Sequence, residues 1–229
     1  MILDTLEDLR RTAYVNAVMS DNVVGWVGAR VPVEVFEALG LTVYPLYGID
    51  AEILEYSSGK DMCPIIDATI TYAKTDKCPL IHSSKLIVAD DTCRAMLAAL
   101  SRLPDKHIHV YADTEGLLAV LQDVYGTGGL LPEKLSAVRE ERTRIRRRIQ
   151  SLTNDPLEGF IIGYYMNFLD IWERMSFLDG IAGRELGVSH KFVETIYHCP
   201  ECRGKFEGGV NYGRLSCNVG SLRDGRKDS

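Results

Sequence analysis

Cysteine is the residue type with the most specific chemistry in this chain. Three cysteines lie in the first half of the sequence and three lie near its end: Cys63, Cys78 and Cys93, then Cys199, Cys202 and Cys217. Three thiolates occupy three of the four coordination positions of a tetrahedral metal ion, or bind three of the four irons of a [4Fe-4S] cluster. The position that stays open can bind a substrate. Disulfides use cysteines in pairs, so two groups of three favour metal or cluster chemistry.

The tail cysteines include a motif with the spacing of a metal-binding knuckle. In the segment His198-Cys199-Pro200-Glu201-Cys202, two residues separate the two thiols. This C-x-x-C spacing is typical of zinc and iron–sulfur sites, and Cys217 or His198 could supply further ligands. Because a second C-x-x-C pair is missing, the motif alone leaves zinc and a cluster both open.

The elements that must position the first trio alternate between strands and helices. Short apolar runs predict strands at 22–29, 41–48, 84–90 and 107–112. Helical spacing predicts a lead-in helix at 3–19 and further helices at 31–40, 64–76, 92–103 and 114–126. This alternation indicates βαβ units around a mostly parallel sheet. Residues 1–126 are therefore expected to form a Rossmann-like or flavodoxin-like three-layer α/β domain.

We expect residues 127–185 to form a helical segment. We expect residues 186–229, which are rich in cysteine and glycine, to form a partly disordered tail. The segment is expected to hold two helices, at 132–152 and 157–179, the second with an apolar stripe through Tyr164, Phe168 and Trp172. The first helix carries six arginines mixed with glutamates. This mixture favours a solvated face over a nucleotide or RNA site.

Two cysteines of the first trio are expected at helix N-termini. Cys63 precedes Pro64 and an apolar helix, where the helix dipole favours a thiolate. Cys93 follows the strand at 84–90 and so lies at the carboxyl edge of the sheet, where open α/β sheets bind ligands. Cys78 lies in a connector, and a small core residue is the simpler interpretation there.

Composition narrows the class and location of the protein. A net charge of −6 argues against general nucleic-acid binding. No segment approaches the roughly 18 apolar residues of a membrane span, and acidic residues near the N-terminus are unlike a signal peptide. A cytoplasmic location is therefore expected. Thiols stay reduced there, which again favours metal, cluster or catalysis over disulfides.

A longer stretch resembles a known family. The run GWVGARVPVEVFEALGLTVYPLYG (25–48) resembles a signature of the 2-hydroxyacyl-CoA dehydratase and benzoyl-CoA reductase subunits, with its Val-Pro-x-Glu helix and following turn. Cys63-Pro64 and Thr92-Cys93 match the family's first two cluster cysteines. The helical stretch beginning LPEKLSAVREER resembles the family's insertion between two α/β domains. The resemblance covers residues 20–185.

The resemblance implies an iron–sulfur subunit of a lyase-type enzyme. In the family three cysteines hold an oxygen-sensitive [4Fe-4S] cluster whose open iron site faces an acyl-CoA thioester. An ATP-dependent activator protein injects one electron, and the 2-hydroxy group leaves as water. The implied partners are a second dehydratase-type subunit, or a second copy in a homodimer, together with that activator.

The third cluster ligand is the point where this chain departs from the family. A second α/β domain supplies it in the family, and the sequence ends where that domain would begin. Cys199 is the candidate to take its place, and Cys202 is a further candidate metal ligand. The alternative is a non-catalytic binding or assembly protein whose C-x-x-C tail binds zinc.

Two charged residues near the expected ligand edge complete the candidate site. Glu34, on the Val-Pro-Val-Glu helix, could orient a substrate or transfer a proton as a catalytic group, or could be a solvated carboxylate. Arg30 could contact a phosphate of CoA, or could form a surface ion pair.

Overall fold

The computed structural model describes residues 2–28, 30–47, 51–57, 63–75, 77–91, 93–103 and 105–185. The predicted tail from residue 186 onward lies outside these ranges. Two of the predicted metal ligands, Cys199 and Cys202, are therefore outside the described residues, together with the further candidates Cys217 and His198.

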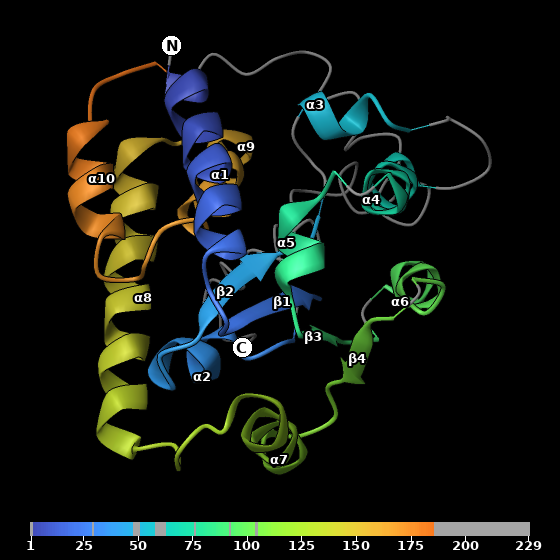
Figure 1. Ribbon diagram of the computed structural model, residues 1–229. Helices are drawn as coiled ribbons and strands as arrows, with labels where there is room; N and C mark the ends of the chain where they lie inside the picture. The colour runs from blue at the N-terminus through green and yellow to red at the C-terminus, as the bar shows by residue number, and fades with distance from the viewer. Residues whose placement is uncertain are drawn as a thin grey trace, which may run out of the picture.

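A parallel four-stranded sheet forms the centre of the fold (Figure 1). Its strands are β1 (Val23–Val27), β2 (Thr42–Pro45), β3 (Leu86–Ala89) and β4 (His107–Val110), and their spatial order is β2-β1-β3-β4. Each neighbouring pair is parallel, with Val24 opposite Val43 on one side and opposite Leu86 on the other. The predicted α/β class is confirmed.

The direction in which the strands are added to the sheet reverses between β1 and β3, and this place is called the switch point. From β1 the chain crosses to β2 on one side, and it later returns to place β3 on the opposite side of β1. The connections that leave β1 and β3 therefore diverge in opposite directions. Such a point, at the carboxyl ends of the strands, is where open α/β sheets form a crevice for a ligand.

Helices cover both faces of the sheet, as Figure 1 shows. One face packs on α2 (Val33–Ala38) and α7 (Thr114–Tyr125), through strand residues that include Val24, Trp26 and Val88. The other face uses the alternate strand residues, such as Val23 and Ile87, because successive side chains of a strand point to opposite faces. It packs on α1 (Ile2–Val18), α4 (Pro64–Lys74), α5 (Pro79–Ser83) and α6 (Arg94–Leu100).

In the described part of the chain, three further helices follow the sheet: α8 (Pro132–Leu152), α9 (Pro156–Met166) and α10 (Arg174–Gly180). The long helix α8 contacts α2, α9 and α10, and α9 contacts α1. Apolar residues of α8 and α9, such as Ile145 and Ile161, belong to the same buried cluster as the second face of the sheet. The predicted bounds of the helix at 132–152 are confirmed, because Pro132 fixes its first turn.

The prediction of a single helix over 157–179 was wrong, because α9 and α10 are separate. Side-chain hydrogen bonds stabilise the break: the Asn167 amide donates to the Gly163 and Tyr164 carbonyl oxygens, and Asp170 accepts from the Trp172 backbone N–H. Asparagine and aspartate compete with helical hydrogen bonding in this way. Trp172 is consequently 59% exposed and does not extend the apolar stripe.

The connector between β2 and β3 holds more helix than its sequence predicts. A short helix, α3 (Ala51–Leu54), lies where only a loop is expected, and α5 follows Cys78. Both are too short to show an apolar period.

Within the described ranges, no helix combines the length and the apolar character that crossing a membrane requires.

Candidate functional site

A buried aspartate links the two connections of the switch point. Asp90 follows β3, is 2% exposed, and its carboxylate accepts a hydrogen bond from the backbone N–H of Arg30, in the connection after β1. Its own backbone N–H donates to the Val27 carbonyl oxygen at 3.1 Å. Gly28 makes this approach possible, because a Cβ there would overlap the Asp90 carboxylate. Its φ of +132° is also one that other residues rarely adopt.

Arg30 is held at the same point by a second aspartate. Its guanidinium pairs with the carboxylate of Asp91, the residue after Asp90, and its side chain remains 61% exposed. Of the two roles that the sequence allows for Arg30, the surface ion pair is thus present. An exposed guanidinium can still bind an anion, so contact with a substrate phosphate stays a prediction.

Cys63 and Cys93 each lie at the N-terminus of a helix, where the sequence predicts them. Cys93 precedes the first residue of α6, and its Sγ accepts a hydrogen bond from the Met96 backbone N–H at 3.4 Å. Cys63 stands in the same position on α4, with Pro64 as the first helical residue. Both thiols are partly buried, and the helix N-terminus favours the thiolate form that binds metals.

The two helices that begin with these cysteines are neighbours. Helix α4 contacts α6, and both cysteines pack against the same buried apolar cluster on one face of the sheet. Whether the two sulfur atoms bind one group stays a prediction.

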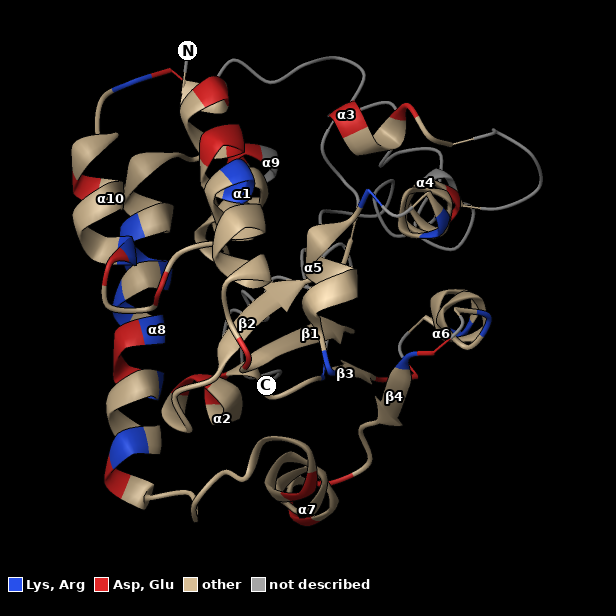
Figure 2. Cartoon of the chain, viewed as in Figure 1, with Lys and Arg blue, Asp and Glu red and all other residues tan. Residues whose placement is uncertain are grey.

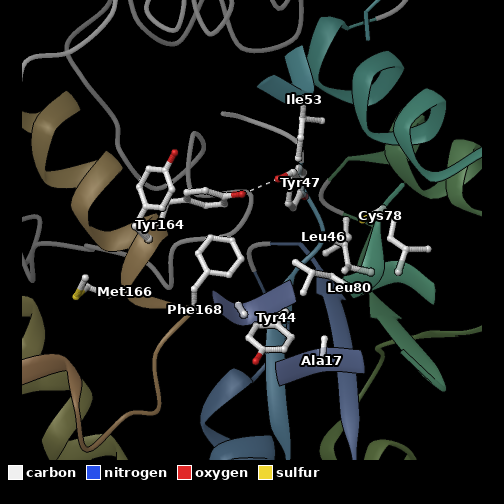
Figure 3. Close-up of a cluster of buried hydrophobic side chains, with 14 of the residues drawn as sticks. Ala17, Tyr44, Leu46, Tyr47, Ile53, Cys78, Leu80, Tyr164, Met166 and Phe168 are labelled. Carbon is white, nitrogen blue, oxygen red and sulfur yellow. Dashed lines mark hydrogen bonds between the residues drawn. The ribbon is translucent and has the colours of Figure 1, made fainter. Parts of the chain in front are cut away.

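Cys78 is part of the core. It is 7% exposed and belongs to the large apolar cluster. Figure 3 shows it with Leu46 and Leu80, on the side of the cluster away from the aromatic rings of Tyr164 and Phe168. This placement agrees with the interpretation of Cys78 as a small apolar residue.

The described residues contain no complete metal site. Within the ranges that the structure covers, no three side chains of the cysteine, histidine, aspartate and glutamate types are grouped closely enough to hold a metal ion. Cys63 and Cys93 are soft ligands suited to iron–sulfur clusters or zinc, so they fit as two ligands of such a group. A third cysteine ligand would have to come from outside the described residues.

Arg30 and Glu34 line a cleft beside the switch point. The cleft has a volume of about 600 Å³ and lies between the connection after β1, the start of α2, the end of β4 and helix α8. Glu34 is 25% exposed, and its Oε1 lies 3.3 Å from Arg139 Nη2. Neither Cys63 nor Cys93 is among the described residues that line the cleft. The structure thus groups Arg30 with Glu34 and places the two cysteines apart from this lining.

Three arginines of α8 line the same cleft, which the sequence interpretation missed. Figure 2 shows basic and acidic bands along α8, in contrast to the uncharged β1 and α5. Arg139, Arg142 and Arg146 recur at three and four residues, the spacing of one helix face. That spacing is visible in the sequence, but only the contact of α8 with α2 shows that this face is covered.

A buried ion pair fixes the wall of the cleft. Glu37 of α2 binds Arg142 with an O–N distance of 2.8 Å and Arg174 with one of 2.7 Å. Burial alone would raise the pKa of Glu37, but the two guanidinium groups outweigh burial and hold that pKa below its usual value. Burial also lowers the pKa of Arg174. Helices α2, α8 and α10 therefore meet at one carboxylate.

Comparison with known proteins gives one informative similarity. No protein-family model matches the chain. Over 99 residues it is 28% identical to the Escherichia coli protein named "Putative dehydratase subunit YjiM". The matched region is 40% of this chain but only 26% of that protein, about a quarter of its length. The chain is therefore similar to part of a dehydratase subunit, which agrees with the resemblance at the level of a dehydratase-like protein.

Proposed function

We propose that this chain is an iron–sulfur subunit of the 2-hydroxyacyl-CoA dehydratase type. The observation that carries the proposal is the placement of Cys63 and Cys93 at the N-termini of two neighbouring helices. The similarity to a dehydratase subunit supports the same assignment. The proposed cofactor is a [4Fe-4S] cluster on Cys63, Cys93 and Cys199. Such a cluster would supply a Lewis acid and a one-electron donor.

The residues around the switch point would position the substrate. Arg30 presents an exposed guanidinium at the mouth of the cleft and would bind an anionic group of an acyl-CoA. Glu34 lines the same cleft and is restrained by Arg139, so it would orient polar groups of the substrate. The proposed partners are a second dehydratase-type subunit, or a second copy, and an ATP-dependent activator protein.

Metal analysis tests the cofactor. The protein is purified without oxygen, and its iron, sulfide and zinc are measured together with its visible absorbance. We expect about four iron and four sulfide per chain and a brown colour. Zinc without iron would refute the cluster and favour the zinc-binding alternative.

Cysteine variants test the ligands. Cys63→Ser and Cys93→Ser are each expected to lose most of the iron and the visible absorbance. Cys78→Ala is the matched control, because Cys78 is buried in the apolar core and its loss should leave the iron content unchanged. Retention of the chromophore in both serine variants would exclude the proposed ligands. Acyl-CoA dehydration is then assayed with the reduced activator.

A further inference from the structure

Four arginines gather at the cleft between α2 and α8 of an acidic protein. The lining contains Arg30, Arg139, Arg142 and Arg146 together with one glutamate, Glu34. Two further carboxylates, those of Asp91 and Glu37, pair with Arg30 and Arg142. These four cations and three carboxylates leave one positive charge, in a chain whose net charge is −6. Unbalanced positive charge in a cleft raises the local concentration of anions.

Three of the four arginines already have carboxylate partners, and the fourth does not. Arg30 pairs with Asp91, Arg139 with Glu34, and Arg142 with Glu37. Arg146 lines the cleft and is partly buried, yet makes no ion pair or hydrogen bond with any residue that the structure describes. Burial and the neighbouring Arg142 lower the pKa of Arg146, and the carboxylate of Glu34, which is bound to Arg139, opposes this effect only in part. A partly buried cation without a partner is costly unless a ligand supplies the opposite charge.

A second group in the lining also lacks a partner. Trp26 of β1 is 1% exposed, and its indole N–H has no hydrogen-bond acceptor among the described residues. Trp26 belongs to the lining of the same cleft. Buried indole N–H groups normally find an acceptor. The cleft therefore combines a cation and a neutral donor that the described part of the chain leaves unsatisfied.

We propose that this cleft binds the diphosphate group of a nucleotide-sized small molecule, with Arg146 as its main anchor. A diphosphate carries several acceptor oxygens for Arg146 and the Trp26 indole N–H, and its negative charge is opposite to that of Arg146. Arginine binds phosphate oxygens through two parallel hydrogen bonds. Thr114 also lines the cleft and offers a hydroxyl donor, whereas the hydroxyl of Thr143 already donates to the Arg139 carbonyl oxygen at 2.8 Å. A volume of about 600 Å³ lies within the range of small-molecule sites and exceeds the size of the anion alone.

This site is distinct from the proposed cluster. Its lining residues come from β1, α2, α7 and α8 and the connections after β1 and β4, and they include neither Cys63 nor Cys93. The proposal shares Arg30 with the proposed function but does not need iron to be bound. A protein that lacked iron yet bound diphosphate would refute the cluster and keep this site.

Tryptophan fluorescence provides a direct test. The chain has two tryptophans, and Trp172 is 59% exposed and outside the cleft, so Trp172→Phe leaves Trp26 as the single reporter. This variant of the full chain is titrated with inorganic pyrophosphate, and isothermal titration calorimetry measures the same binding independently. We expect a saturable change in Trp26 fluorescence and a matching heat signal. Absence of saturable binding in both measurements would overturn the proposal.

Two substitutions on α8 separate a specific site from general attraction of anions. Arg146→Gln, in the Trp172→Phe background, is expected to weaken pyrophosphate binding about tenfold or more. Arg147→Gln is the matched control: it removes the same charge from the next residue, which is exposed and outside the cleft lining. We expect that control to change the affinity less than about twofold. Equal weakening by the two variants would contradict a specific site.

Thermal unfolding shows whether Arg146 has only a structural role. Without ligand, Arg146→Gln should unfold at the same temperature as the parent or slightly above it, because it removes a partly buried charge that lacks a described partner. At the same pyrophosphate concentration, the parent should gain more stability than the variant, because the variant binds the ligand more weakly. A large loss of stability without ligand would assign Arg146 to the scaffold instead and overturn its role as anchor.

Two further ligands identify the source of the diphosphate. ADP, which carries a nucleoside on its diphosphate, is expected to bind more tightly than pyrophosphate because it fills more of the cleft. Inorganic phosphate, with fewer acceptor oxygens, is expected to bind more weakly than pyrophosphate. A phosphate affinity equal to that of pyrophosphate would contradict recognition of a diphosphate.

Discussion

Arg174 Nη2 lies 2.7 Å from Glu37 Oε1, in a pair that joins residues 137 positions apart in the sequence. Both side chains are almost fully buried, with 6% and 5% of their surface exposed. The Arg174 guanidinium also donates to the Leu169 carbonyl oxygen, in the turn that follows α9. Because Glu37 binds Arg142 as well, this one carboxylate connects α2 to both α8 and α10. The wall of the basic cleft depends on this connection.

Removing one partner of the buried pair is expected to destabilise the protein strongly. Arg174→Met would leave Glu37 with one guanidinium in a buried place, and Glu37→Gln would leave two arginines without their anion. Loss of one partner of a buried pair costs about 3–5 kcal/mol. Urea unfolding followed by circular dichroism measures the change in the free energy of unfolding.

An exposed ion pair provides the control for this experiment. Arg11 Nη1 and Asp8 Oδ1 are 2.8 Å apart, close to the 2.7 Å of the buried pair, but their side chains are 58% and 66% exposed. Arg11→Gln is expected to change the free energy of unfolding by less than about 1 kcal/mol. A comparable loss in Arg11→Gln and Arg174→Met would mean that burial does not determine the effect.

The stability of the protein should decrease in acid because of Glu37. Its pKa in the folded protein is held below the ordinary value of 4.5, so its contribution is fully present above that pH. The contribution is lost as the pH falls through the lower folded pKa, because the unfolded chain then binds the proton more readily. The difference in free energy of unfolding between the parent and Glu37→Gln should therefore shrink between about pH 5 and pH 3. A difference that is constant over this range would contradict the assignment.

Gly28→Ala tests the close contact at the switch point. The added Cβ would overlap the buried Asp90 carboxylate, and the φ of +132° would be strained for alanine. We expect a loss of about 1–3 kcal/mol in the free energy of unfolding from the strain, with additional cost if Asp90 moves. Gly128→Ala is the matched control, since a Cβ there meets no atom within 4 Å. Thermal unfolding of both variants measures the contrast, and equal effects would contradict it.

The three cysteines of the first half should differ in their accessibility to alkylating reagents. Cys63 and Cys93 are partly exposed at helix N-termini, whereas Cys78 is 7% exposed in the core. Iodoacetamide applied to the folded, iron-free protein should label Cys63 and Cys93 at least about tenfold faster than Cys78. Peptide mass spectrometry over time resolves the individual rates. Similar rates before and after unfolding in urea would contradict this difference.

Local sequence signals predicted the sheet and several helix boundaries well. Pro64 and Pro132 mark the starts of α4 and α8, and the apolar runs mark β1 and β3, which are buried on both faces. The prediction of one helix over 157–179 was wrong, because the hydrogen bonds of Asn167 and Asp170 interrupt the helix although the apolar spacing continues. The spacing of apolar residues does not show where side chains compete with the backbone for hydrogen bonds.

By itself, the sequence determined the parallel α/β class and the position of Cys63 and Cys93 at helix N-termini, because these follow from residues adjacent in the chain. Only the tertiary structure decided that Gly28 packs on Asp90, and that Arg139, Arg142 and Arg146 share one cleft. The tertiary structure also decided that Glu37 pairs with both Arg142 and Arg174. These relationships depend on the strand order and on the packing of α8 against α2. Contacts between residues distant in sequence are set by how whole apolar faces are buried together, which no local spacing specifies.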